Sequence, residues 1–162
     1  MNMTSKNGRS GGLSAKKPDP EALLKRMAGL CARSEQCTFD ISTKLYKARL
    51  PLEEREKIID YLTENRYLDD ARFARSFASY KIRFSAWGKR KIRMALASKR
   101  IPSPLIAEAL DAIDENDYSD ALKRVIESKK KEIDTTDREQ RAKLFRHLLS
   151  RGFESDRISR ML

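Results

Sequence analysis

The sequence is poor in the residues that most enzyme sites require. Its 162 residues include one histidine, His147, and two cysteines, Cys31 and Cys37. This inventory is too small for a site in which four thiolate or imidazole groups hold a metal ion. A single histidine suggests no nucleophile–base pair, and neither the G-x-x-x-x-G-K-[ST] nor the G-x-G-x-x-G phosphate-binding motif occurs. We therefore predict a protein that is not an enzyme and that needs no metal or cofactor.

Valine is nearly absent, occurring only at Val125, and isoleucine and threonine form no alternating runs. Because β-branched residues are enriched in strands, this composition argues against a β-sheet and predicts an all-α fold. No apolar run approaches the roughly 20 residues of a membrane span, and the N-terminus lacks an apolar run of signal-peptide length. We therefore expect a reduced, cytoplasmic protein with no membrane span. Its basic helices also lack bulky apolar residues on a free face, so we expect no membrane partner.

Positive charge, in contrast, is abundant and unevenly distributed. The chain has 35 Lys and Arg against 24 Asp and Glu, which gives a net charge of +11. Residues 81–100 contain eight basic and no acidic side chains, whereas residues 104–122 contain six acidic and no basic ones. This segregation favours a polyanionic partner (nucleic acid, an acidic protein surface or an anionic membrane face) over simple solubility.

Landmark residues recur with a period of about 50 residues. Apolar positions match at offsets of 51 and then 52 residues in three segments, namely Ile41 and Leu45, Ile92 and Leu96, and Leu144 and Leu148. An E-N-x-Y-x-D pattern at residues 64–69 also recurs at residues 115–120. Such a period predicts stacked copies of one unit, here three helices resembling a helix-turn-helix. The expected organisation is a disordered basic tail at 1–17 and repeats at 18–68, 69–119 and 120–162.

The most regular helical pattern lies between residues 67 and 101. Four aromatic residues recur on one face of its first helix, namely Phe73, Phe77, Tyr80 and Phe84. Such rings can stack on nucleic-acid bases, but at this spacing we predict that they form part of the core. We interpret Asp69 and Asp70 as helix-capping residues rather than as paired catalytic carboxylates. Trp87 is either a partner contact or a plug between units, and both alternatives stay open.

Basic side chains line the opposite faces of the helices in this stretch. The candidates for contact with a partner or with DNA are Arg72, Arg75, Arg83, Lys89, Arg90, Arg93, Lys99 and Arg100. Arginine offers paired donors that match carboxylate and phosphate groups, and lysine offers a point charge. The alternative, a face that is simply solvated, stays open.

Two patterns in the last third of the chain predict helix ends. Residues 136–139 read Thr-Asp-Arg-Glu, the pattern of a capping box that opens a helix. Gly152 follows that helix, at a position where glycine can adopt a positive φ.

The central motif resembles that of the RecX family of bacterial regulatory proteins, which act on the RecA recombinase. The resemblance rests on Tyr67-Leu68-Asp69-Asp70-x-Arg72-Phe73-Ala74, followed by Gly88-x3-Ile92-x3-Leu96-x2-Lys99-x-Ile101. It implies three tandem three-helix repeats in an elongated, curved array. It also implies a protein without catalysis of its own that lies in the groove of the RecA–DNA filament and inhibits ATP hydrolysis, strand exchange and co-protease activity.

The resemblance also assigns roles to the matching residues. Most are expected to hold the fold, namely Tyr67, Asp69, Asp70, Phe73, Gly88, Ile92, Leu96 and Ile101, whereas Arg72 and Lys99 are expected to be free for a partner. The family usually has glycine where this chain has Arg100. Arg100 must therefore adopt a left-handed conformation, at a cost of about 1 kcal/mol, or end the helix differently.

Two functional hypotheses follow. The first is a monomeric modulator that contacts both RecA and single- or double-stranded DNA within the filament. The alternative is a free-standing DNA-binding protein of helix-turn-helix type, which would bind naked DNA with a steep salt dependence.

Overall fold

The computed structural model describes residues 17–133 and 136–162 and contains nine α-helices and no strand within these ranges. The helices are α1 (Pro20–Arg33), α2 (Thr38–Lys47), α3 (Leu52–Glu64), α4 (Asp70–Ser85), α5 (Lys89–Ser98), α6 (Ser103–Asp111), α7 (Glu115–Lys130), α8 (Arg138–Ser150) and α9 (Ser155–Met161). The predicted all-α fold is confirmed. Residues 1–16, the greater part of the expected basic tail, lie outside the described residues. No described helix is long and apolar enough to cross a membrane.

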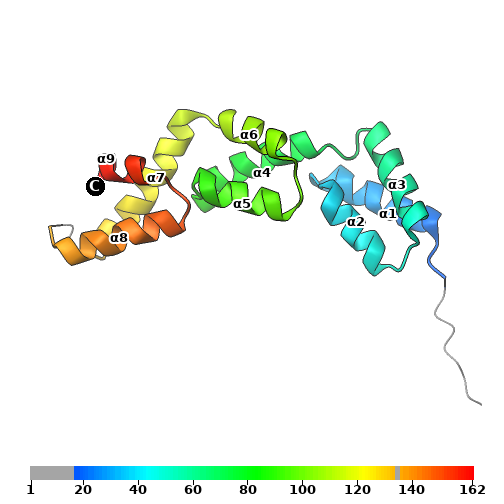
Figure 1. The fold of residues 1–162 in the computed structure, drawn as a ribbon, viewed down its shortest axis with the longest axis horizontal. Coiled ribbons are helices and arrows are strands. Elements are labelled where there is room, and N and C mark those ends of the chain that lie inside the picture. The colour runs from blue at the N-terminus through cyan, green and yellow to red at the C-terminus, as the bar shows by residue number, and fades with distance from the viewer. Residues whose placement is uncertain (1–16, 134–135) are drawn as a thin grey trace, which may run out of the picture.

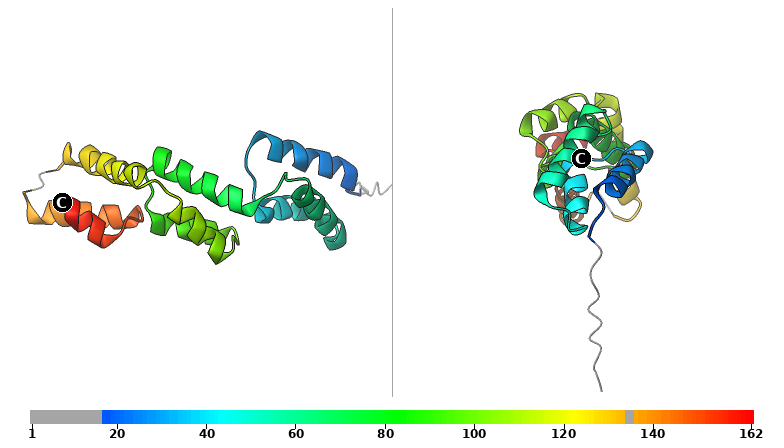
Figure 2. Two further views of the ribbon diagram at one scale, coloured as in Figure 1. Left: turned by 90° about the horizontal axis from the view of Figure 1, so that it is seen from above. Right: turned by 90° about the vertical axis from the view of Figure 1, so that its right-hand side faces the viewer.

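The helices form three units of three that follow one another in an elongated row (Figure 1). The α1–α3 unit lies at one end, α4–α6 in the middle and α7–α9 at the other end, and the view along the row is much narrower than the side views (Figure 2). The matched apolar positions are buried in each unit, namely Ile41 and Leu45, Ile92 and Leu96, and Leu144 and Leu148. The second helix of each unit therefore follows the register found in the sequence.

The E-N-x-Y-x-D match, in contrast, does not relate equivalent positions. Glu64 ends α3, whereas Glu115 begins α7, so the same letters fall at opposite ends of helices. Asp120, which the pattern matches with Asp69, lies inside α7, and the N-cap of this helix is Asp114. The expected start of the third repeat at residue 120 thus falls within a helix, and we propose that the third unit begins at Asp114.

Aspartate carboxylates satisfy the free N–H groups at the starts of four helices. The N-cap residues of α1, α4, α7 and α8 are Asp19, Asp69, Asp114 and Asp137. Asp69 accepts from the Arg72 N–H at 2.9 Å, as its capping role predicted. The expected capping box that starts at Thr136 is wrong in detail, because Asp137 is the N-cap and accepts from the Glu139 N–H at 2.7 Å.

Three helices end in a residue with left-handed backbone at matching positions of the repeat. These are Arg49 (φ 61°), Arg100 (φ 57°) and Gly152 (φ 92°). Glycine adopts this conformation without strain, whereas each arginine costs about 1 kcal/mol. Arg100 therefore ends α5 in the conformation that glycine provides elsewhere, and this defines the turn that the sequence left open.

The apolar side chains form two separate cores. The first core lies within α1–α3 and the following loop, and comprises Met27, Ile41, Leu45, Leu50, Ile58, Leu62 and Leu68. The second core runs continuously through the middle and last units, from Phe73 to Ile158, and also takes in Cys37 from the first unit. Burial raises the pKa of Cys37 to about 11, so this thiol stays protonated and acts as a packing residue.

The same kind of contact joins each unit to the next. The N–H of Thr38, the first residue of α2, donates to Asp70 Oδ1 of α4 at 2.8 Å. The N–H of Lys89, the first residue of α5, donates to Tyr118 Oη of α7 at 3.1 Å. Thr38 and Lys89 are matched positions of the repeat, and neither helix has a side-chain cap from its own N-cap residue. The first helix of the following unit therefore caps the second helix of the preceding one.

The middle and last units also approach each other closely at two glycines. The Gly88 N–H donates to the Arg151 carbonyl at 2.8 Å, and the Arg90 N–H donates to the Gly152 carbonyl at 3.1 Å. A Cβ atom on Gly88 would lie 2.1 Å from the carbonyl carbon of Gly152. Glycine is therefore required at residue 88 by the backbone that packs against it.

Candidate functional site

Arg72 and Lys99, expected to be free for a partner, are instead engaged in ion pairs with the first unit. Arg72 Nε lies 2.6 Å from Glu35 Oε1, and Lys99 Nζ lies 2.6 Å from Asp40 Oδ2. The hydrogen bond to Glu35 is the main cause that raises the pKa of Arg72. Both side chains join the first unit to the middle one, so the expectation that they are free is wrong.

Three further candidates are partly engaged. Arg83 pairs with Asp117 of α7 at 2.7 Å. Lys89 Nζ lies 5.2 Å from the centroid of the Tyr118 ring, and the Arg100 guanidinium carbon lies 5.0 Å from that of Phe39. Cation–π contact leaves the charge of the lysine or arginine uncancelled, so Lys89 and Arg100 still contribute to the positive potential of the surface.

Arg75, Arg90 and Arg93 keep their side-chain donors available. All three are exposed, and no hydrogen bond or ion pair joins their guanidinium groups to another residue in ranges 17–133 and 136–162. Arg90 and Arg93 lie three residues apart on α5, so they share one face of that helix. Of the eight predicted candidates, these three are the best placed to bind a carboxylate or a phosphate.

The motif residues that were expected to hold the fold are buried or make capping and backbone contacts. Four of them are buried apolar residues, namely Phe73, Ile92, Leu96 and Ile101. Asp69, Asp70 and Gly88 make the capping and close backbone contacts described above. Tyr67 lies in the loop between α3 and α4, where its carbonyl accepts from Arg72 Nη2 at 3.4 Å.

The predicted aromatic core of α4 is wrong at two of its four positions. Tyr80 is 57% exposed and Phe84 is 74% exposed, whereas Phe73 is buried and Phe77 is partly buried. The buried face of α4 instead includes alanines 74 and 78, which allow α6 to pack closely. The buried face of α4 is therefore rotated about the helix axis relative to the line of four aromatic residues, and this line follows the edge of the buried face.

Two lysines that sequence reasoning missed flank Trp87. Lys81 Nζ and Lys91 Nζ lie 4.5 and 4.6 Å from the centroid of the Trp87 ring system. Phe77 contacts Trp87 edge-on at 6.5 Å, and Trp87 packs in part against the second core. A signal for these contacts was present in the sequence, because residues 81–100 contain no acidic side chain. Lysines in this stretch have no neighbouring carboxylate in the sequence to pair with, so an aromatic ring is the available partner.

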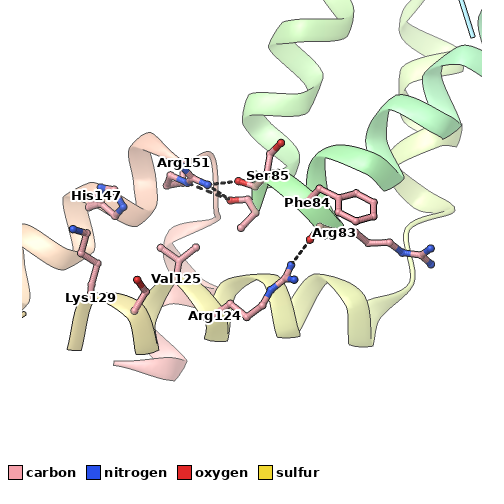
Figure 3. Close-up of a pocket in the computed structure, with 10 residues that line it drawn as sticks. Arg83, Phe84, Ser85, Arg124, Val125, Lys129, His147 and Arg151 are labelled. Carbon is pink, nitrogen blue, oxygen red and sulfur yellow. Dashed lines mark hydrogen bonds between the residues drawn. The ribbon is translucent and has the colours of Figure 1, made fainter. Parts of the chain in front are cut away.

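A cavity of about 490 Å³ opens between the end of α4 and helices α7 and α8 (Figure 3). Arg124 Nη2 donates to the Arg83 carbonyl at 2.8 Å, and Arg151 donates to the carbonyls of Ser85 and Ala86. The two guanidinium groups thus satisfy the carbonyls that end α4. Lys129 and His147 also line the cavity, and none of the described residues that line it is acidic. The cavity is therefore cationic.

The pKa of His147 is lowered by its position in this cavity. Burial, followed by the charges of Lys129 and Arg151, lowers its pKa below the usual value, while Glu132 acts in the opposite direction. The part of the chain that the structure describes holds no group of three or more His, Cys, Asp or Glu placed to bind a metal ion.

The lowered pKa of His147 predicts a pH-dependent stability. The unfolded chain takes up a proton at about pH 6.5, whereas folded His147 takes it up only at lower pH. The free energy of unfolding should therefore fall as the pH drops below about 6.5, and level off once the pH lies below the folded pKa. Urea unfolding at several pH values would measure this fall. The part due to His147 should be missing in His147→Gln, and parallel pH profiles for the two proteins would contradict the assignment.

Sequence comparison identifies the last two units. The model of the RecX second three-helix domain matches residues 69–110, and that of the RecX third three-helix domain matches residues 116–162. Together these matches cover more than half of the chain. The chain belongs to the RecX family. The three-unit fold and the central motif are therefore those of a RecX protein.

Bacterial relatives agree with this assignment. The regulatory protein RecX of Vibrio parahaemolyticus is 31% identical over 130 residues, which cover 80% of this chain and 83% of the relative. That of Pseudomonas fluorescens is 33% identical over 141 residues, covering 87% and 90%. The crystal structure of RecX from Lactobacillus salivarius, 17% identical, superposes with a TM-score of 0.74 over 86% of this chain and 92% of its own. The chain thus has the RecX fold and the regulatory role of RecX proteins.

Proposed function

We propose that this RecX protein binds the filament that RecA forms on DNA and inhibits its ATP hydrolysis, strand exchange and co-protease activity. Membership of the RecX family supports this proposal, because the proteins of that family are regulatory proteins that act on the RecA recombinase. The observation that carries it is the elongated row of units (Figure 1), together with the exposed Arg75, Arg90 and Arg93 side chains on the middle unit, which pair with no other described residue. An elongated protein can contact several filament subunits at once, while its cations contact acidic side chains or phosphates.

The helix arrangement argues against the alternative of a free-standing helix-turn-helix protein. In that class the N-terminal residues of a recognition helix reach into the major groove. The N-terminus of α5 is covered here, because Tyr118 and Gly152 of the last unit pack on it. The third helix of the middle unit, α6, carries no Lys or Arg and carries two acids, Glu108 and Asp111. Neither helix is suited to reading a DNA groove.

A RecA ATPase assay on single-stranded DNA tests the proposed function directly. Added in equal amount to RecA, the purified protein should lower the rate of ATP hydrolysis and of strand exchange. Unchanged rates would reject the proposal. Tight, salt-sensitive binding to naked DNA together with unchanged RecA rates would favour the alternative.

The free arginines of α5 should matter for inhibition. We expect the double variant Arg90→Glu, Arg93→Glu to need about tenfold more protein for half-inhibition, since two exposed ion pairs contribute up to about 1 kcal/mol each. Its helix content should stay unchanged because both side chains are exposed. The measurement is the ATPase titration combined with far-UV circular dichroism.

A matched control is available on α2. Lys44 and Lys47 have the same spacing and are also exposed, so Lys44→Glu, Lys47→Glu changes the net charge equally at another site. An equal loss of inhibition in both double variants would show that total charge, and not the α5 face, determines binding.

A further inference from the structure

Two exposed aromatic rings lie at the last turns of α4, beside the cationic cavity. Tyr80 and Phe84 pack against each other with ring centroids 5.0 Å apart. Phe84 is 74% exposed and is one of the residues that line the cavity, and Figure 3 shows its ring pointing away from Arg151, His147 and Lys129. Exposed aromatic rings lose the stabilisation that burial gives them, and paired exposed rings beside a cationic cavity offer a flat surface for a ligand.

The cavity next to these rings is suited to a phosphate group. Arg124 and Arg151 hold their guanidinium groups in place by donating to the carbonyls that end α4, and guanidinium N–H groups that these bonds do not use remain available. Lys129 and His147 add donors from α7 and α8, and the Ser128 hydroxyl also lines the cavity. No acidic side chain belongs to the described lining, but Glu132 Oε2 lies 2.7 Å from Lys129 Nζ, so an anion there competes with this carboxylate for Lys129.

We propose that this cavity and its rim bind one strand of a single-stranded nucleic acid, with a phosphodiester among Arg124, Lys129 and Arg151 and an adjacent base stacked on Phe84. This inference rests on the proposed function in one respect, namely that the DNA of a RecA filament supplies the strand. Base–aromatic stacking beside cations that follow the backbone is the usual way in which proteins bind single strands without reading sequence.

The observations favour a single strand over the other polyanions. A duplex hides the faces of its bases in its own stack, so it would use the cations but leave the Phe84 ring unused. An acidic protein segment would likewise pair with the cations but would not need an exposed pair of rings. A single strand alone offers flat base faces and regularly spaced phosphates together.

Stacking of a base on the Phe84 ring can be tested by measuring the affinity of the full chain for short oligonucleotides in the absence of RecA. Phe84→Leu should weaken binding of oligothymidylate about fivefold or more, since stacking of one base on an aromatic ring has about that effect. The same variant should leave binding of an abasic oligonucleotide of equal length unchanged, because that probe has phosphates but no bases. Tyr61→Leu, which removes an exposed ring of the first unit, serves as control and should change neither affinity.

Binding of a phosphate by the cationic side chains of the cavity can be tested with a second matched pair of variants. Lys129 and Lys123 both lie on α7 and both pair with an acid three residues away, but only Lys129 lines the cavity. Lys129→Gln should weaken both oligonucleotides about two- to fivefold and lower the slope of log affinity against log salt by about 0.7. Lys123→Gln should alter neither property.

His147 supplies an independent readout, because it is the chain's one histidine and lines the cavity. A phosphate bound beside it stabilises the imidazolium, so oligothymidylate should raise the pKa of His147 measured by NMR. An unchanged pKa of His147 at saturating oligonucleotide would overturn the proposal, as would an equal effect of Phe84→Leu on the affinities for the two oligonucleotides.

The outcomes also separate this inference from the proposed function. If Phe84→Leu reduced inhibition of RecA but not oligothymidylate binding, the ring would contact protein, and this inference would fail while the proposed function stood. If the wild-type chain left RecA unaffected, the proposed function would fail, and the oligonucleotide results would still decide the cavity.

Discussion

Gly88→Ala is expected to lower the free energy of unfolding by about 3 kcal/mol or more. The added Cβ would lie 2.1 Å from the carbonyl carbon and oxygen of Gly152 and 2.2 Å from the Phe153 nitrogen. These are backbone atoms in a tight turn, so no side-chain rotation relieves the overlap, and the last unit must move away from α5. Chemical denaturation followed by circular dichroism would measure the loss.

Gly29→Ala is the matched control for this substitution. Gly29 lies inside α1, and a Cβ atom there would meet nothing within 4 Å. Alanine is favoured over glycine in helices, so this variant should gain about 0.5–1 kcal/mol. Equal stabilities of Gly88→Ala and Gly29→Ala would show that the two backbones are not in close contact.

Phe153→Ala is expected to lower the free energy of unfolding by about 3–5 kcal/mol. Phe153 is fully buried in the second core, with its ring centroid 5.6 Å from that of Tyr118. Truncation removes that contact and leaves a cavity in the second core. The midpoint of urea unfolding is the appropriate measurement.

The same truncation at Phe84 should have almost no effect on stability. Its ring is 74% exposed, so Phe84→Ala should stay within about 0.5 kcal/mol of the wild-type chain. The contrast separates a phenylalanine that is buried in the second core from one that is available to a ligand. A loss of several kcal/mol in Phe84→Ala would show that its ring is buried in solution.

The parts of the fold that the sequence predicted depend on local patterns. Apolar spacing located Ile92 and Leu96 as core residues, and the register carried that prediction to Leu144 and Leu148 in the next unit. Gly152 was found because a positive φ after a helix favours glycine. Such signals are contained in a few neighbouring residues, so they can be read without knowing the tertiary contacts.

The missed features depend on contacts between distant residues. Arg72 was expected to be free because nothing in the sequence connects it with Glu35, 37 residues away. The core face of α4 was misassigned because Ala74 and Ala78 are buried by close approach of another helix, and small residues carry little hydropathy signal. The cationic cavity draws its lining from α4, α7 and α8, and its existence follows only once these helices are placed together.

The separation of the two cores has a mechanical consequence. Tilting the last unit relative to the middle one would open a continuous apolar core and expose its surface to water. The first unit has its own core and adds only Cys37 to the buried residues of the second core. Its other contacts with the middle unit include the Thr38–Asp70 hydrogen bond and the Arg72–Glu35 and Lys99–Asp40 ion pairs, which water and salt can replace. Bending of the molecule along a curved ligand should therefore concentrate between α3 and α4, with a stiffness that falls as ionic strength rises.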